Sequence, residues 1–193
     1  KKTKNITLGD HGKVVLTVPE KPTNEIDMQG GPKTEGIWRA DESFNNDRII
    51  VTKTINVESV QASQAASCDN SIVVSINGKK VLSDESWESA SHVSIQKYLK
   101  PGANHFKFEC NNEGSVAGLV IKLGFKDEQG KVSYVISDSS WFAAKYDTPD
   151  QKTAAVELGP LGRSPWGNVL SGRGGASAGL ESAVPNGVFL TNL

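Results

Sequence analysis

The sequence predicts an all-β protein, an antiparallel β-sandwich with irregular extensions at its N- and C-terminal ends. Several short runs alternate apolar and polar residues, and no run has the length and period of an ordinary helix. Asn77-Gly78 joins two of these runs, and it is a strong hairpin signal because both central residues of the tightest hairpin turns need a positive φ. We therefore expect roughly seven to nine short strands in two layers.

The bulk composition fits one domain of ordinary size. The chain has 193 residues, of which 37% are hydrophobic, enough to bury a core. Lys and Arg total 21 against 22 for Asp and Glu, so no overall field favours nucleic acid or an anionic membrane as a partner. No apolar run approaches the roughly 18 residues of a membrane-spanning helix. Because the chain starts at Lys1 without Met or a signal-like segment, we expect the numbering to begin inside a longer or processed chain.

Changes in composition divide the chain into three expected segments. They are an N-terminal arm or linker with one strand (1–35), the β-sandwich domain (36–147) and a Gly/Pro-rich extension partly docked on the sandwich (148–193). Residues 13–18 form the strand-like run of the arm, which Pro19 and Pro22 end. Glycine and proline become frequent after Gly159, so we expect that part to be irregular, with Leu161 and Trp166 able to dock.

Alternation of apolar and polar side chains places the strands of the sandwich. They are expected at 36–39, 48–57, 60–68, 71–76, 79–82, 106–110, 119–125 and 132–136. In the run 48–57, Ile49, Val51 and Ile55 fall on one face with Lys53 as the exception. Residues 93–99 precede Pro101-Gly102 and are expected to make a short helical turn.

Two explanations are open for the cysteines, Cys68 and Cys110, which each end a predicted strand. No second Cys or His stands at ligand spacing, which argues against a structural zinc site. Strand ends of one sandwich can come within bridging distance, so the two residues could pair in an oxidising compartment. Free cysteine is also a common core residue, and two buried thiols are the interpretation we favour.

Several short pieces of the chain follow one another in a recognisable order and spacing. They are Cys68-Asp69-Asn70, Ser75-Ile76-Asn77-Gly78-Lys79, Trp87, Leu99-Lys100-Pro101-Gly102-Ala103-Asn104, Asn112-Glu113-Gly114, Ala117-Gly118-Leu119 and Ser137-Asp138-Ser139-Ser140-Trp141. Together they resemble the galactose-binding-like β-sandwich, a jelly roll attached to bacterial glycoside hydrolases. Leu158-Gly159-Pro160-Leu161-Gly162 and Pro165-Trp166-Gly167 are similar to a C-terminal signature of such domains in large secreted multidomain proteins of planctomycetes.

The resemblance implies a non-catalytic carbohydrate-binding accessory module of a larger secreted bacterial protein, extracellular or periplasmic. Its partners would be carbohydrate or the neighbouring domains of the parent chain. The alternative is a structural or interdomain docking module with no sugar ligand, because a shared sandwich does not fix a ligand. The chain departs from the family in carrying Cys68 and Cys110 where relatives have small residues, which leaves open a bridge at the end where relatives bind their ligand.

A sugar site needs an aromatic face for the apolar side of a pyranose and a few fixed amide or carboxylate groups for its hydroxyls. The candidate ligand-binding residues, all at predicted strand ends or in loops, are Trp87, Asp84, Asp69, Asn70, Asn112 and Glu113. Each has a plainer interpretation: the tryptophan can pack under its own loop, and Asp and Asn are common turn formers. The remaining tryptophans, Trp38, Trp141 and Trp166, are expected to be packing residues.

Neither a cofactor nor a catalytic residue is predicted. Relatives of this fold often carry a structural calcium ion, and Asp41, Glu42, Asn45, Asn46 and Asp47 offer oxygen ligands. Their spacing is not that of a defined calcium loop, so we expect a solvated acidic loop. Residues 175–179 match the nucleophile-elbow string, but a glycine-rich stretch precedes them where a strand is needed, and no His follows Ser177.

Overall fold

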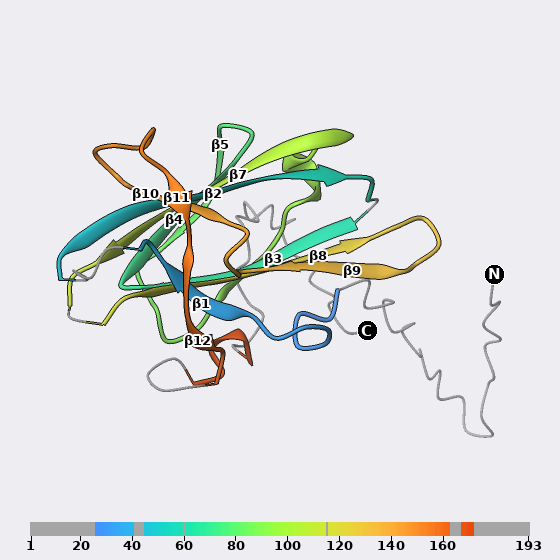
Figure 1. The fold of residues 1–193 in the computed structure, drawn as a ribbon. Coiled ribbons are helices and arrows are strands. Elements are labelled where there is room, and N and C mark those ends of the chain that lie inside the picture. Colours follow the sequence, from blue (N-terminus) through green and yellow to red (C-terminus); the bar gives the residue numbers. More distant parts are fainter. Residues whose placement is uncertain (1–25, 41–44, 60, 115, 163–166, 172–193) are drawn as a thin grey trace, which may run out of the picture.

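A computed structural model describes residues 26–40, 45–59, 61–114, 116–162 and 167–171. It has two antiparallel six-stranded sheets that face each other (Figure 1). The prediction of an all-β antiparallel sandwich is confirmed. The strand expected at 13–18 lies outside the described residues, and so does Trp166.

The first sheet has the strand order β12-β1-β8-β3-β6, and β9 also pairs with β8. Its strands are β1 (Glu35–Trp38), β3 (Gln61–Asp69), β6 (Ser91–Ser94), β8 (Gly118–Lys126), β9 (Val132–Ile136) and β12 (Val156–Pro160). The strands β1 and β9 pair with different ends of β8, through Ile37 opposite Leu119 and Tyr134 opposite Gly124. The long pair β3 and β8 therefore forms the centre of this sheet.

The second sheet has the strand order β11-β10-β2-β7-β4-β5. Its strands are β2 (Asp47–Val57), β4 (Ser71–Ile76), β5 (Lys79–Asp84), β7 (Gly102–Asn112), β10 (Phe142–Lys145) and β11 (Thr153–Ala154). The hairpin between β4 and β5 turns at Asn77 and Gly78, whose φ angles are 51° and 78°. The predicted hairpin is confirmed, because both turn residues adopt the positive φ that the turn requires.

Alternate residues of each strand point into the space between the sheets and form the main core. Ile49 and Val51 of β2 and Phe106 and Phe108 of β7 are fully buried there. Trp141 is also fully buried, and its ring meets that of Phe108 edge to face with centroids 5.6 Å apart. The predicted packing role of Trp141 is confirmed.

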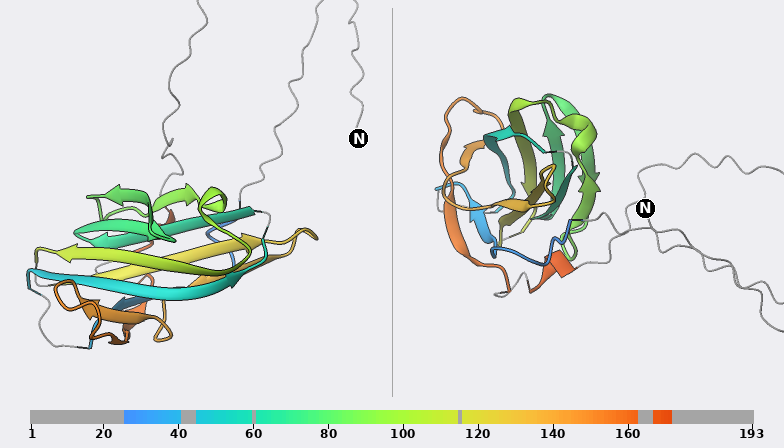
Figure 2. Two further views of the ribbon diagram at one scale, coloured as in Figure 1. Left: turned by 90° about the horizontal axis from the view of Figure 1, so that it is seen from above. Right: turned by 90° about the vertical axis from the view of Figure 1, so that its right-hand side faces the viewer.

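Two stretches differ from the sequence-based expectation. Residues 93–99 are not one helical turn: β6 ends at Ser94, and a 3₁₀ helix, η1 (Gln96–Tyr98), follows. The reason is that Val93 pairs with Gln64 of β3, a partner that a local pattern does not show. The C-terminal part, expected to be irregular, contains β11, β12 and a 3₁₀ helix η2 (Val169–Ser171). Figure 2 shows the segment from β10 to β12 running along one side of the sandwich.

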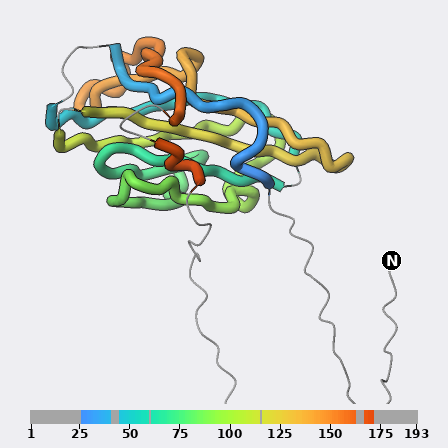
Figure 3. The backbone as a smooth tube through the Cα atoms, turned by 90° about the horizontal axis from the view of Figure 1, so that it is seen from below, coloured from blue at the N-terminus to red at the C-terminus, as the bar shows by residue number. Residues whose placement is uncertain are grey.

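A third layer covers the outer face of the first sheet (Figure 3). It consists of residues 26–32, here called the strap, together with Leu161 and η2. The strap lies close to β8, since a Cβ atom at Gly124 would be 2.5 Å from the Ile26 side chain. The Tyr134 hydroxyl donates to the Asp27 carbonyl oxygen at 2.6 Å. Both faces of β8 are therefore buried.

Candidate functional site

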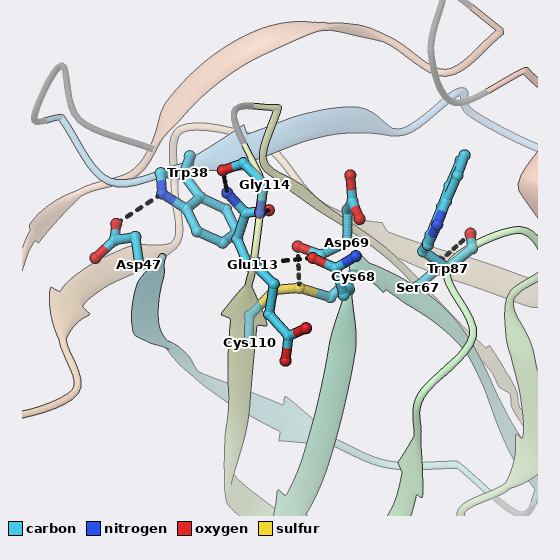
Figure 4. The surroundings of a disulfide bond; sticks show 11 residues. Trp38, Asp47, Ser67, Cys68, Asp69, Trp87, Cys110, Glu113 and Gly114 are labelled. Atoms are coloured by element: carbon cyan, nitrogen blue, oxygen red, sulfur yellow. Dashed lines mark hydrogen bonds between the residues drawn. A yellow bond between two sulfur atoms is a disulfide. The ribbon is translucent and has the colours of Figure 1, made fainter. Parts of the chain in front are cut away.

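The six predicted site residues lie at or beside one end of the sandwich, here called the disulfide end. Figure 4 shows three of them, Asp69, Trp87 and Glu113. At this end β3 finishes at Asp69 opposite Gly118 of β8, and β7 finishes at Asn112. Asp84 pairs with Ile72, the second residue of β4. The antiparallel register therefore brings the strand ends and loops that were selected from the sequence into one region.

A disulfide bond joins Cys68 of β3 to Cys110 of β7 and so links the two sheets. Their Cα atoms are 5.9 Å apart, within the usual range for a bridge. The favoured interpretation of two free thiols is therefore wrong in this structure. The sequence pattern could not decide the question, because pairing depends on two strand ends of different sheets facing each other across the core.

Two of the candidate residues hold their own loops. The Asn112 side chain is fully buried, donates to the Gly114 carbonyl oxygen at 2.9 Å and accepts from the Gly114 amide at 3.2 Å. The Asp84 carboxylate accepts from the Ser86 amide at 2.9 Å and from the Ser91 hydroxyl. These are the bonds expected of turn formers, the plainer of the two interpretations.

Asn70 and Glu113 connect two loops at the disulfide end. The Asn70 Oδ1 atom accepts from the Glu113 amide at 2.7 Å. The Glu113 side chain is exposed, and its carboxylate accepts from Asn111 Nδ2 at 3.2 Å. The half-buried Asn70 side chain keeps its Nδ2 group without a protein acceptor in the part of the chain that the structure describes. This amide can therefore donate to a ligand while its oxygen holds the loop.

Trp87 is half-buried, so it is neither an open platform nor a residue enclosed by its loop. Its backbone carbonyl accepts from the Ser67 hydroxyl at 2.8 Å, which fixes the loop to β3. Its side chain packs against Val120 of β8 and Val169 of η2. Since Ser67 and Val120 are register partners, Trp87 sits on the outer face of the first sheet.

Asp69 lies two residues after Ser67 and so shares the outer face of β3 with it. Its carboxylate is half-buried and makes no hydrogen bond or ion pair with the described residues. Burial raises the pKa of this carboxyl group above its usual value because the charged form loses solvation. Figure 4 shows the carboxylate at the end of β3 and the Trp87 indole, on the loop between β5 and β6, extending in the same direction. Together they offer an apolar ring and a hydrogen-bond acceptor.

Three residues that hold Trp87 in place were not predicted from the sequence: Ser67, Val120 and Val169. One signal was available in β8, where residues 118–125 are almost continuously apolar. An antiparallel strand with one solvated face should alternate, so such a run indicates that both faces are covered. Nothing in the local sequence shows that η2 supplies the cover, because that contact joins distant segments.

A concavity of about 770 Å³ lies at the end of the sandwich opposite the disulfide end. Its apolar wall includes Val57, Leu99 and Phe125, and its rim carries charges of both signs, among them Glu58 and Lys131. None of the predicted site residues lines it. Phe125 is only 7% exposed, so its ring is not presented as a platform for a sugar.

The expectation of a solvated acidic loop, with a structural calcium ion as the alternative, stays a prediction. Residues 41–44 of the acidic loop lie outside the described residues. The Asp47 carboxylate accepts from Trp38 Nε1 at 3.1 Å and from Arg39 Nε at 2.8 Å, so it is already engaged. Across the described ranges, no three His, Cys, Asp or Glu side chains gather closely enough to hold a metal ion. Within the same ranges no helix is long and apolar enough to cross a membrane.

The fold is a β-sandwich, and the Cys68–Cys110 disulfide bond joins its two sheets. No protein-family model matches the chain, and no curated protein matches its sequence. Solved structures do match its fold. An α-L-rhamnosidase of Streptomyces avermitilis, solved with L-rhamnose, gives a TM-score of 0.64 at 22% identity over 72% of this chain and 16% of that one.

Two further solved structures share the fold. A lectin of Pleurotus ostreatus, solved with GalNAc, gives a TM-score of 0.64 at 24% identity and covers 71% of this chain and 45% of that one. A GH78 family rhamnosidase of Bacillus sp. GL1 gives 0.58 at 18% identity, covering 72% of this chain and 20% of that one. The chain thus spans less than half the length of each neighbour. At these identities the likeness establishes the sandwich fold alone.

Proposed function

We propose that this chain is a non-catalytic carbohydrate-binding module, an accessory domain of a larger secreted bacterial protein. A sugar ring stacks on Trp87, and its hydroxyls bond to the Asp69 carboxylate and the Asn70 Nδ2 group. Equilibrium binding of this kind raises the local concentration of a neighbouring catalytic domain on its substrate. No covalent step is required of the site.

The observation that carries the proposal is the Asp69 carboxylate, which has no partner among the described residues and stands on the same face as Trp87. A partly desolvated carboxylate without a hydrogen bond is costly in the free protein. A ligand whose hydroxyl groups donate hydrogen bonds to the carboxylate removes that cost. An adjacent ring supplies the apolar face that a pyranose needs.

The solved neighbours support the same class of ligand. The Pleurotus ostreatus lectin was solved with GalNAc and the Streptomyces avermitilis enzyme with L-rhamnose. In the rhamnosidases the matching region is a small part of a long chain, as an accessory domain would be. The Cys68–Cys110 bridge supports an extracellular or periplasmic location, because disulfides persist in oxidising compartments.

A docking module with no sugar ligand is the second candidate, and a specific observation favours it. Phe142 and Val156 are 48% and 43% exposed. They lie in β10 and β12, along the side of the sandwich where the chain passes from one sheet to the other. Exposed large apolar side chains are typical of a surface that meets another domain.

A sugar titration followed by intrinsic tryptophan fluorescence tests the proposal. The probes are galactose, GalNAc, L-rhamnose and soluble polysaccharides. We expect a saturable change that Trp87→Ala abolishes and that Asp69→Asn weakens by about tenfold, the loss of one charge-assisted hydrogen bond. Trp38 and Trp141 are fully buried and serve as an unchanging background signal.

Glu128→Gln is the matched control, because it removes a carboxylate from the rim of the opposite concavity. This variant should bind as the unaltered protein does. If no sugar changes the fluorescence of the folded protein, the carbohydrate proposal fails and the docking module is favoured. Sugar binding that survives Trp87→Ala but is lost in Glu128→Gln would place the sugar site in the concavity opposite the disulfide end.

A further inference from the structure

A cavity of about 300 Å³ lies between the strap and the Leu161–Gly162 turn, on the outer face of the first sheet. It is distinct from the Asp69 and Trp87 site, since neither residue lines it. Lys122 of β8 lines the cavity beside Thr34, which precedes β1. Both of these side chains are almost completely buried.

Lys122 is 2% exposed, and a lysine this deeply buried needs partners for its charge. Its ammonium group donates to the carbonyl oxygens of Gly30 and Pro32, the latter at 3.1 Å. It also lies 5.0 Å from the centre of the Tyr134 ring. An ammonium group has three protons, and the two carbonyls accept two of them. One donor is left for a ligand.

Thr34 is fully buried, and its hydroxyl has no hydrogen-bond partner among the described residues. Buried polar groups are nearly always hydrogen-bonded, and one without a partner destabilises the folded protein. Thr34 and Lys122 both belong to the lining of the cavity. Two residues with donor capacity left over therefore lie at one cavity.

The lining favours a negatively charged occupant. Besides Lys122 it includes Lys33 and the amides of Gln29 and Asn168, and no Asp or Glu is among its described residues. The charge of Asp27 does act on Lys122, but this residue is not in the lining and its carboxylate accepts from the Gln29 amide at 2.9 Å. Burial lowers the pKa of Lys122, as expected for an ammonium group that lacks a counter-ion in contact.

We propose that this cavity binds a small carboxylate, with one oxygen accepting from the Lys122 ammonium group and from the Thr34 hydroxyl. A single buried cation matches a single negative charge, and the volume admits a molecule of monosaccharide size or smaller. The carboxylate comes either from a free organic acid or from the uronic acid of a polysaccharide. The proposal stands independently of sugar binding at Trp87.

Amide chemical-shift titration of the unaltered protein with acetate, galacturonate and galactose tests the proposal, with sodium chloride used to match ionic strength. We expect saturable shifts at residues 29–34 with a carboxylate probe and none with galactose or chloride. Thr34→Val keeps the shape of the side chain and removes its hydroxyl. It should weaken carboxylate binding by about tenfold, equivalent to about 1.4 kcal/mol.

Thr34→Val also separates a binding role from a structural one. Because the hydroxyl has no partner in the free protein, the variant should fold with unchanged or higher stability. Lys107→Met, on the solvated face of the second sheet, is the charge control and should bind both probes normally. Response to galacturonate alone identifies a uronic acid as the ligand, and response to both probes identifies a general carboxylate.

Two results would overturn the proposal. One is the absence of a saturable shift with either carboxylate, which would mean that the cavity holds water only. The other is binding that Thr34→Val leaves unchanged, which would place the carboxylate elsewhere on the surface.

Discussion

The outer faces of the two sheets differ in their exposure to solvent. On the second sheet, Lys107 is 36% exposed and pairs with Glu109 at 2.6 Å, and Arg48 stands over the Tyr146 ring at 3.4 Å. On the first sheet, Lys122 occupies an equivalent outward position in its strand but is only 2% exposed, and its ammonium group donates to two carbonyl oxygens of the strap. The same residue type is therefore solvated on one face and buried on the other.

This difference explains where the candidate sites lie. A charge on the solvated face is satisfied by water, and its ion pairs contribute little. Where the outer face of the first sheet is buried, polar groups need a protein partner, and the half-buried Asp69 and the fully buried Thr34 find none among the described residues. The covered face is thus the place where a ligand gains most by supplying the missing partner.

Removing the disulfide is expected to have the largest effect on the free energy of unfolding, because the bridge joins the two sheets whose outer faces are compared. In the double variant Cys68→Ala and Cys110→Ala, a cross-link that spans a sequence separation of 42 residues is lost. Loop-closure entropy for that length predicts a loss of about 4 kcal/mol in the free energy of unfolding. Urea denaturation measures it. An unchanged midpoint would show that the bridge does not constrain the unfolded chain.

Alanine substitution of one lysine on each face tests the comparison directly. Lys122→Ala leaves the Gly30 and Pro32 carbonyls without their donor and opens space under the strap, so it should cost about 2–3 kcal/mol. Lys107→Ala removes only an exposed ion pair and should cost less than about 1 kcal/mol. The free energies of unfolding of the two variants give the comparison. Equal losses of stability in the two variants would mean that the strap does not shield Lys122 from solvent.

The close approach of the strap to β8 can be tested with a single methyl group. In Gly124→Ala the new Cβ atom would be 2.5 Å from the Ile26 side chain, so the strap must shift, at a cost of about 1–3 kcal/mol. Gly114→Ala is the matched control, since its nearest neighbour would be 3.9 Å away and the change should stay within about 0.5 kcal/mol. Hydrogen exchange at residues 26–32 locates the effect. Similar stability of both variants would contradict the observed packing.

The strands and the hairpin could be predicted because they depend on local alternation and on the conformational preference of Asn77-Gly78. The burial of Trp38 and Trp141 could also be predicted, since large aromatic residues at strand boundaries usually pack. Strand β6 was missed because four residues carry too little periodicity, and its identity comes from pairing with β3. The prediction of the domain boundaries at 35 and 147 stays a prediction.

The location of the candidate site was partly predictable from the positions of the strand ends. Choosing polar residues at strand ends brought Asp69, Asn70 and Asn112 to one end, because antiparallel register makes those ends meet. Their separate roles were not predictable. Whether an Asn faces the core or solvent depends on its position in the pleat, and whether Asp69 has a partner depends on distant segments. The Cys68–Cys110 bridge and the cover over Lys122 likewise join segments far apart in the sequence.

The smallest expected effect is a pH-dependent change in stability at Asp69. Because burial raises the pKa of this carboxyl group in the folded protein, the folded state binds more protons than the unfolded state, and stability falls as pH rises above 3.8, the ordinary pKa of the group. Asp69→Asn removes the charge. It should therefore raise stability at pH 7 by up to about 0.5 kcal/mol, while at pH 3 the gain disappears. Thermal unfolding at the two pH values measures the difference, with exposed Glu113→Gln as the control. A variant that is less stable at pH 7 would show that the carboxylate is already paired, and sugar binding would then lose its main support.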